Sequence, residues 1–370
     1  MKVLVTGSKG FLGSNLVATL KTQEYDGMEF DRETTLEELE VMCQNCDIVF
    51  HLAGVNRSIN PEDYAKGNTD LSENLVFLLQ KHHNKAAVVF SSSIQSKLDN
   101  DYGNSKREAE TVFANHAKSN HSKVYIYQLT NLFGKWNKPN YNSVISTWSH
   151  KISRNEAIEV SDPMITLNLN YVDDVVQEFM AVIEGNVFQE DSLYYQINPT
   201  YTKTLQTISD LLHKFKDSRS NLFIPNMEDP FERKLYATYL SYIPTNEFSY
   251  DLKMNNDERG SFTEFLKTEE RGQVSINIAK PGITKGEHWH HTKNEKFLVV
   301  SGSGTIKLRH INSKEVITYN VSGEKLKVVD IPPGYTHNIT NKGHTDMVTV
   351  MWVNEPFDPN TPDTFYKKVE

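Results

Sequence analysis

The chain has 370 residues, of which 38% are hydrophobic and 24% charged, and its net charge is −9 at pH 7. This length predicts two domains with ordinary hydrophobic cores. The negative charge argues against nucleic-acid binding, because phosphate contacts need a basic surface, but an anionic small substrate can still bind in a locally positive cleft.

The N-terminus, MKVLVTGSKG, does not resemble a signal peptide, because its apolar stretch is short and glycines follow at once. No apolar run approaches the ~20 residues of a membrane helix. We therefore expect a cytoplasmic protein.

The N-terminal half alternates short apolar runs with longer amphipathic segments. Runs typical of buried strands are 3–5, 48–51, 87–90 and 124–128. Helical spacing occurs between them at 11–22, 72–82 and 104–116. This alternation predicts an α/β Rossmann fold, a parallel sheet with helices on both faces.

A glycine-rich turn follows the first predicted strand. Gly7, Gly10 and Gly13 form G-x-x-G-x-x-G at the start of a helix, where backbone N–H groups can bind a pyrophosphate. Asp31, eighteen residues beyond Gly13, is placed to bind a ribose hydroxyl. Arg32 favours NADP over NAD because it can pair with a 2′-phosphate, although a solvated surface charge is the alternative.

The only cysteines, Cys43 and Cys46, form a C-x-x-C pair. This spacing can mark a redox or zinc site, but no second pair of ligands stands nearby. We interpret both as buried structural thiols.

Tyr102 and Lys106 are four residues apart and share one helix face. An ammonium beside a phenol favours the phenolate, so we expect a lowered pKa for Tyr102 and a role as general acid. A serine hydroxyl from the preceding run, 91–93, can hold the substrate carbonyl oxygen.

The glycine turn, HLAG at 51–54, SSS at 91–93 and Y-x-x-x-K occur in an order that closely resembles the extended short-chain dehydrogenase/reductase family, over roughly residues 1–245. The resemblance implies that Tyr102 is the acid, Lys106 binds the nicotinamide ribose, and Ser93 polarises the carbonyl, with Ser92 as its alternative. The cofactor contacts it implies are Thr6, Gly7, Gly10, Phe11, Leu12, Gly13, Asp31, Arg32, His51, Leu52, Ala53, Gly54, Tyr102 and Lys106.

Members of this family mostly act on nucleotide sugars. Asn131 matches their substrate-side N-x-x-G segment, and 170–174 matches their later V-D-D segment. Two features depart from the family: the loop between the serine run and the tyrosine is short, and the arginine ahead of V-D-D is absent. The diphosphate must then be held elsewhere, with Arg233 or Lys234 as candidates.

Beyond residue 245 the pattern changes to short alternating runs separated by Gly and Pro turns. These runs are 275–280, 296–310, 315–319, 325–334 and 347–353. They predict a small all-β barrel or sandwich. The polar stretch 250–260 marks the boundary, which gives a reductase domain at 1–245 and a β domain at 250–370.

Four residues of the β domain have metal-ligand spacing. His288 and His290 are two apart, so they point to the same side of a strand, and Glu295 follows a short loop. His337 lies beside a Pro-Gly turn. Three imidazoles and a carboxylate suit a divalent transition metal, whereas a lone histidine would more often be structural. We expect His291 to face outward.

These residues fit the cupin pattern G-x5-H-x-H-x4-E-x6-G, which runs from Gly282 to Gly302, and then P-x-G-x2-H-x3-N, which ends at Asn341. A reductase of this type fused to a cupin resembles the CapF-like group of bacterial capsule enzymes over essentially the whole chain. The stretches 231–244 and 255–268 are also similar to that group.

The resemblance implies two steps on one pathway. The cupin would epimerise C3 of a UDP-2-acetamido-2,6-dideoxy-4-hexulose. The reductase would then reduce C4 with NADPH to UDP-2-acetamido-2,6-dideoxy-L-talose, toward UDP-N-acetyl-L-fucosamine. Zinc and a homodimer are also implied, while spacing alone leaves iron, manganese and nickel open. Tyr335, Lys296 and Arg259 are candidates for the base.

Two alternatives remain. The cupin could be a non-catalytic dimerisation module with a structural metal, since a closed four-ligand zinc shell is compatible with the spacing. The chain could instead be an NADP sensor, but such sensors tend to lose the catalytic tyrosine and lysine, and both are present here.

Overall fold

The computed structural model describes residues 1–187 and 193–370, and it divides into two compact units. The first comprises Met1–His213 and Glu228–Pro244, and the second Lys214–Met227 and Thr245–Glu370. A boundary drawn at 245–250 misses the segment Lys214–Met227, because helix α8 (Leu205–Asn221) runs from the first unit into the second. Nothing in the composition of α8 marks the point at which it passes from the first unit to the second.

The first unit is built on a six-stranded sheet with the order β2-β1-β3-β4-β5-β8. All of its pairings are parallel, as predicted. The strands are β1 (Lys2–Thr6), β2 (Asp26–Phe30), β3 (Ile48–His51), β4 (Ala87–Ser93), β5 (Val124–Leu129) and β8 (Tyr194–Tyr195).

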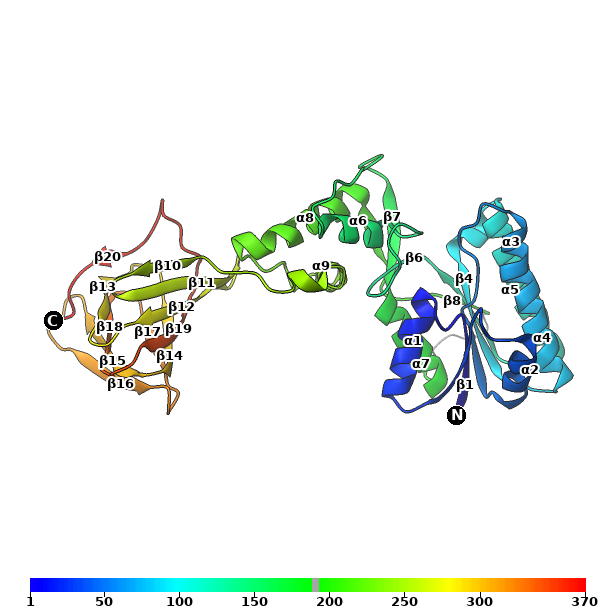
Figure 1. Ribbon diagram of the computed structural model, residues 1–370, viewed down its shortest axis with the longest axis horizontal. Coiled ribbons are helices and arrows are strands. Elements are labelled where there is room, and N and C mark those ends of the chain that lie inside the picture. Colours follow the sequence, from blue (N-terminus) through cyan, green and yellow to red (C-terminus); the bar gives the residue numbers. More distant parts are fainter. Residues whose placement is uncertain (188–192) are drawn as a thin grey trace. The chain divides into compact units, whose positions relative to one another are not determined.

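Helices cover both faces of this sheet (Figure 1). One face carries α1 (Phe11–Thr22) and α7 (Val172–Glu184). The other carries α2 (Leu36–Asn45), α4 (Leu71–Lys81) and α5 (Asp101–Asn120).

The alternation of side chains along β1 shows why these strands have no polar face. Val3 and Val5 pack with α1 and α7, while Leu4 packs with the opposite helices, and all three are fully buried. Complete burial of one such side chain contributes roughly 1.5–3 kcal/mol. The carboxyl ends of the parallel strands are left free to build a site.

A smaller sheet and further helices complete the first unit. The sheet has the order β6-β7-β9. Its strands are β6 (Asn131–Phe133), β7 (Thr166–Tyr171) and β9 (Tyr201–Thr204). The helices are α3 (Glu62–Tyr64), a π-helix (Ala65–Asp70), a 3₁₀ turn (Ile94–Lys97), α6 (Val144–Ile152) and α9 (Pro230–Leu240). Among the described helices, none is long and apolar enough to cross a bilayer.

Apart from the end of α8, the second unit is built from antiparallel β-strands, as predicted, and is consistent with a cupin-like barrel. One sheet contains β10 (Met254–Asp257), β11 (Gly260–Thr268), β12 (Gly272–Ala279), β19 (Met347–Val353), β14 (Glu295–Ser301) and β17 (Val328–Ile331). The other contains β16 (Ile317–Ser322), β15 (Ser303–His310), β18 (Tyr335–Asn341), β13 (Thr284–Trp289) and β20 (Phe365–Tyr366). Apolar side chains such as Phe297, Ile306 and Ile339 form its core.

Cys43 and Cys46 are free and buried, which confirms their structural interpretation. Burial raises the pKa of each thiol to about 12. Neither thiol is therefore a ready nucleophile at neutral pH.

Candidate functional site

The glycine turn joins β1 to α1 and tolerates no side chain at two positions. Gly7 has φ +70°, and a Cβ there would lie 2.7 Å from the backbone nitrogen of Ala53. A Cβ on Gly13 would lie 2.1 Å from the carbonyl oxygen of Gly7. The first turn of α1 has no side-chain cap at Gly10. This backbone fits a pyrophosphate at a helix N-terminus.

Asp31 directly follows the last residue of β2, and its carboxylate already has two partners. It accepts a hydrogen bond from the Glu33 backbone at 2.8 Å and lies 2.9 Å from the Lys9 ammonium. The Glu33 backbone, followed by Lys9, lowers the pKa of Asp31. Arg32 is exposed and forms no hydrogen bond or ion pair with the rest of the described chain. Lys9, which the sequence analysis missed, is a second cation at this edge, but it is paired with the carboxylates of both Asp31 and Glu33.

His51 braces the loop behind the turn. Its Nδ1 lies 2.9 Å from the Thr6 hydroxyl and its Nε2 lies 3.1 Å from Ser72. The Ser72 hydroxyl donates its proton to the Asn68 carbonyl, so it accepts from His51. Burial lowers the pKa of His51 to about 3, which keeps the ring neutral. The imidazole of His51 is therefore part of the buried packing that supports the rest of the HLAG loop.

The pKa of Tyr102 is raised, so the expectation of a lowered value is wrong for this structure. Burial is the main cause, and the nearby Ser93 side chain acts in the opposite direction. The phenol donates to Asn56 Oδ1 at 3.4 Å. Tyr102 is therefore a protonated phenol at neutral pH, which is the form that a general acid needs.

Lys106 lies on the same helix, α5, but its ammonium is directed at the sheet. Its Nζ donates to the carbonyl of Ser91 at 3.0 Å and lies 5.0 Å from the centre of the Phe90 ring. A Cβ on Gly54 would be 3.1 Å from this nitrogen, so the cation borders the HLAG loop. Burial lowers the pKa of Lys106 to about 8.

The two candidate serines, Ser92 and Ser93, point to opposite sides of β4, because side chains alternate along a strand. Ser92 donates to the Glu110 carboxylate within the buried face of β4. Ser93 caps the following 3₁₀ turn by accepting from Gln95, and it is the serine that contacts Tyr102. This geometry favours Ser93 over Ser92 as the partner of the phenol.

Asn68 is a part of the site that the sequence analysis missed. It is buried in the π-helix, accepts from the Val55 backbone at 2.9 Å and donates to the Ser105 hydroxyl at 3.0 Å. It thereby connects the loop after HLAG to the helix of Tyr102 and Lys106. A π-helix often marks a functional site, but no simple sequence pattern predicts one.

On the substrate side, one of the two candidates for the diphosphate clamp is already paired. Lys234 Nζ lies 2.8 and 2.7 Å from the two oxygens of Asp174 and 3.0 Å from the Tyr201 hydroxyl. Asn131 donates to the Asn168 carbonyl at 3.4 Å. The V-D-D segment therefore holds α9 against α7, and Lys234 is engaged in that contact.

In the second unit, the four predicted metal ligands come together. His288, His290, Glu295 and His337 each offer a ligand atom, and these atoms all lie within 4.8 Å of one another. His288 and His337 are cross-strand partners on β13 and β18, and Glu295 begins β14. The His291 side chain is exposed, as expected.

The polar atoms at the centre of this cluster are buried and have no hydrogen-bond partner among the described residues. They are His290 Nε2, Glu295 Oε2 and His337 Nε2. The two imidazole nitrogens lie 3.5 and 3.0 Å from Glu295 Oε2. Lone pairs that face each other at such distances repel unless a proton or a cation lies between them. This donor set fits a divalent transition metal.

Electrostatics prepare His288 and Glu295 for ligation, whereas for His290 burial would lower the pKa but the hydrogen bonds with Glu295 and the Asp363 backbone outweigh it and raise that pKa. Burial, followed by His337, lowers the pKa of His288 to about 4, so that ring is neutral at pH 7. Burial alone would raise the pKa of Glu295, but the imidazoles of His290 and His337 outweigh it and bring it to about 2. Neutral imidazole and ionised carboxylate are the forms that bind a metal.

A cavity of about 1110 Å³ opens onto the four ligands. Of the suggested bases, Arg259 lines it, whereas Lys296 pairs with Asp330 outside it. Lys285 also lines the cavity and was missed. A β-bulge between Gly286 and His288 inserts one residue, which turns Lys285 and His288 to the same side of β13.

The fold and its two clusters define a class of protein: a dinucleotide-binding α/β unit joined to a β unit with a metal-ligand cluster. The model of the NAD dependent epimerase/dehydratase family matches residues 3–195, and that of the polysaccharide biosynthesis C-terminal domain matches 255–365. The chain belongs to the NAD dependent epimerase/dehydratase family and, within it, to the CapF-like group of capsule enzymes.

Individual relatives support this assignment. The chain is 42% identical to a UDP-2-acetamido-2,6-beta-L-arabino-hexul-4-ose reductase of Pseudomonas aeruginosa, across 99% of this chain and 98% of the relative. The capsular polysaccharide assembling protein CapF of Staphylococcus aureus is 52% identical, with a TM-score of 0.94 and full coverage of both chains. A UDP-glucose 4-epimerase of Thermotoga maritima, 19% identical with a TM-score of 0.56 over 67% of this chain, shares only the fold.

Proposed function

We propose that this chain is a bifunctional enzyme of capsule biosynthesis that acts on a UDP-linked 4-keto-6-deoxy amino sugar. The second unit epimerises C3 of UDP-2-acetamido-2,6-dideoxy-4-hexulose. The first unit reduces the C4 ketone to UDP-2-acetamido-2,6-dideoxy-L-talose, a precursor of UDP-N-acetyl-L-fucosamine. The observation that carries this proposal is the presence of both clusters in one chain that is similar, over its full length, to a 4-keto sugar-nucleotide reductase.

In the reductase unit, Tyr102 donates its phenolic proton to the C4 oxygen, and Ser93 holds that oxygen in place. Lys106 binds the ribose beside the nicotinamide, and the glycine turn with Asp31 holds the other end of the dinucleotide. NADPH, which Arg32 favours over NADH, would supply the hydride. The raised pKa of Tyr102 keeps its proton available at neutral pH.

In the second unit, His288, His290, Glu295 and His337 would hold the cation, for which zinc is the family's choice. The cation would supply Lewis-acid polarisation of the ketone, which acidifies the neighbouring C3–H. Lys285 lines the same cavity as the ligands, where its ammonium donates to Asn277 Oδ1 and to the carbonyls of Ser261 and Ile278. Burial lowers its pKa, which makes it a candidate to exchange that proton. A cavity open to all four ligands favours this role over a closed structural metal shell.

The Tyr102→Phe variant tests the reductase step. We expect reduction of the keto sugar to fall by more than about a hundredfold while NADPH still binds, because loss of a general acid typically costs 10²–10⁴ in rate. NADPH consumption and cofactor fluorescence measure the two effects. A loss below about tenfold would mean that another group donates the proton.

The same variant tests the epimerase step, because it leaves the second unit intact. In deuterated water, Tyr102→Phe protein should place deuterium at C3 of the unreduced substrate, as measured by NMR. Absence of label would favour the alternative, in which the second unit is a non-catalytic dimerisation or structural-metal module. A homodimer, also expected, is measured by sedimentation.

A further inference from the structure

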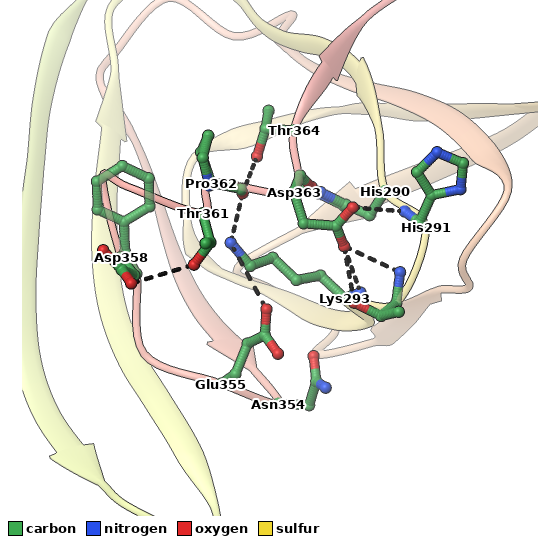
Figure 2. A network of polar contacts seen from close by, with 12 residues as sticks. His290, His291, Lys293, Asn354, Glu355, Asp358, Thr361, Pro362, Asp363 and Thr364 are labelled. Carbon is green, nitrogen blue, oxygen red and sulfur yellow. Dashed lines mark hydrogen bonds and ion pairs between the residues drawn. The ribbon is translucent and has the colours of Figure 1, made fainter.

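The C-terminal segment 358–366 folds over the loop 290–294, which carries the predicted metal ligand His290 (Figure 2). Its last strand, β20, pairs with β13, so that Tyr366 lies opposite His288 and Phe365 opposite Trp289. One residue of this segment, Asp363, contacts the ligand loop through both its backbone and its side chain.

The backbone contact is made with a ligand itself. His290 Nδ1 lies 2.6 Å from the carbonyl oxygen of Asp363, and a carbonyl can only accept, so Nδ1 carries the proton. The neutral ring then has its lone pair on Nε2, the buried nitrogen that faces Glu295 and has no hydrogen-bond partner among the described residues. The carbonyl of Asp363 thus sets both the tautomer and the direction of the ring.

The side chain of Asp363 fixes that carbonyl in place. Its carboxylate accepts from the backbone N–H groups of His291, Thr292 and Lys293 at 2.9, 2.9 and 3.0 Å, and from the Thr292 hydroxyl at 2.9 Å. Asp363 has a φ of +39°, in the left-handed region that a non-glycine residue enters at a cost. This conformation lets one residue direct its carbonyl at His290 and its carboxylate at the three residues after it.

Lys293 adds a second connection in the same place. Its side chain is only 5% exposed, and its Nζ donates to the Pro362 carbonyl at 2.5 Å and lies 3.8 Å from Glu355. The residue before Asp363 is therefore held as well, so the segment cannot shift without breaking contacts on both sides of His290.

We propose that Asp363 is a positioning residue of the metal site, which sets the tautomer and orientation of His290 and thereby the affinity of the second unit for its cation. This inference depends on the metal site of the proposed function. It assigns a specific role to a segment that supplies no ligand.

The test compares Asp363→Ala with the matched control Asp358→Ala. Asp358 lies in the same segment and accepts from the backbone of Asn360 and the Thr361 hydroxyl. Its carboxylate feels the charge of Lys293 but, unlike that of Asp363, it does not accept hydrogen bonds from the backbone of residues 291–293. Zn²⁺ affinity is measured by competition with a chromophoric chelator, and the Co²⁺-loaded proteins are compared by visible absorption. Asp363→Ala should bind Zn²⁺ about 10–100-fold more weakly and show an altered Co²⁺ spectrum, whereas Asp358→Ala should match wild type in both.

Asp363→Asn is a second variant that separates loss of metal affinity from misfolding, because its amide oxygen can still accept hydrogen bonds. We expect it to fold and to bind Zn²⁺ more tightly than Asp363→Ala. Wild-type affinity and an unchanged Co²⁺ spectrum in Asp363→Ala would overturn the inference alone. A wild-type protein that binds no ion at His288, His290, Glu295 and His337 would overturn the metal site itself, and this inference with it.

Discussion

Lys106 shows how burial can change the chemistry of a single residue. Its ammonium is enclosed by β4 and the HLAG loop, and it makes its hydrogen bond to a neutral carbonyl. Burial lowers the pKa of Lys106 from 10.5 to about 8, and the charge of Glu110 offsets this effect only in part. A cofactor hydroxyl that binds Lys106 therefore loses its charged partner in mildly alkaline solution.

We expect NADPH affinity to decline as pH rises through about 8, because Lys106 loses its proton there. Below that pH the ammonium is charged and binding should be level. Fluorescence titration of NADPH between pH 6 and pH 10 measures this, and Lys106→Met should remove the decline. Tyr102→Phe is the control: burial raises the pKa of the phenol above its ordinary value, so this variant should keep the decline. If the decline of NADPH affinity with pH disappeared in Tyr102→Phe, the decline would be due to the tyrosine.

At the residue scale, the sequence predicts which chemical groups are present but not their surroundings. The Y-x-x-x-K spacing places Tyr102 and Lys106 on one helix, yet the ammonium is directed at Ser91, so it does not lower the pKa of the phenol. Asn68 and Asp363 escape detection for a related reason. Each acts through backbone contacts with a segment that is remote in sequence.

At the scale of elements, the β1–α1 turn illustrates a motif that the sequence does specify. Gly7 and Gly13 lie so close to their neighbours that added side chains would collide with backbone atoms. Such a turn can be predicted because the requirement is local. The β-bulge in β13 cannot, because it depends on the register with β18, and only that register reveals Lys285 as a neighbour of the metal ligands.

Gly13→Ala tests the turn. Its Cβ would lie 2.1 Å from the Gly7 carbonyl oxygen, so the backbone must open, and we expect a loss of about 1–3 kcal/mol of stability together with weaker NADPH binding. Gly27→Ala on β2 is the matched control, because a Cβ there meets nothing within 4 Å. Urea unfolding and cofactor titration give both quantities. Equal stability and affinity in the two variants would show that the turn does not need its glycine.

At the scale of the whole molecule, each unit has a core of its own. Two apolar clusters flank the parallel sheet, and a third fills the β unit. The sequence predicts both units because hydrophobic periodicity changes from α/β to all-β along the chain. It does not predict that the segment Lys214–Met227 belongs to the second unit, because helix α8 keeps one pattern across the division between the units.

Separate cores lead us to expect that removal of the metal affects one unit only. A cation held at about 1,000 times its dissociation constant stabilises the folded state by about 4.1 kcal/mol, so a chelator should lower the melting temperature of the second unit by roughly 10 °C. The melting of the first unit and its NADPH affinity should not change. Calorimetry with and without chelator resolves the two transitions, and added Zn²⁺ should restore the original melting temperature of the second unit.

His290→Ala should reproduce the effect of the chelator without any additive, because it removes one of four ligands. This variant should still reduce a substrate already inverted at C3, since Tyr102, Lys106 and Ser93 lie in the other unit. Loss of that reduction, or a parallel fall in the melting of both units, would mean that the metal site also supports the reductase. The two activities would then depend on one cooperative structure, although each unit has a core of its own.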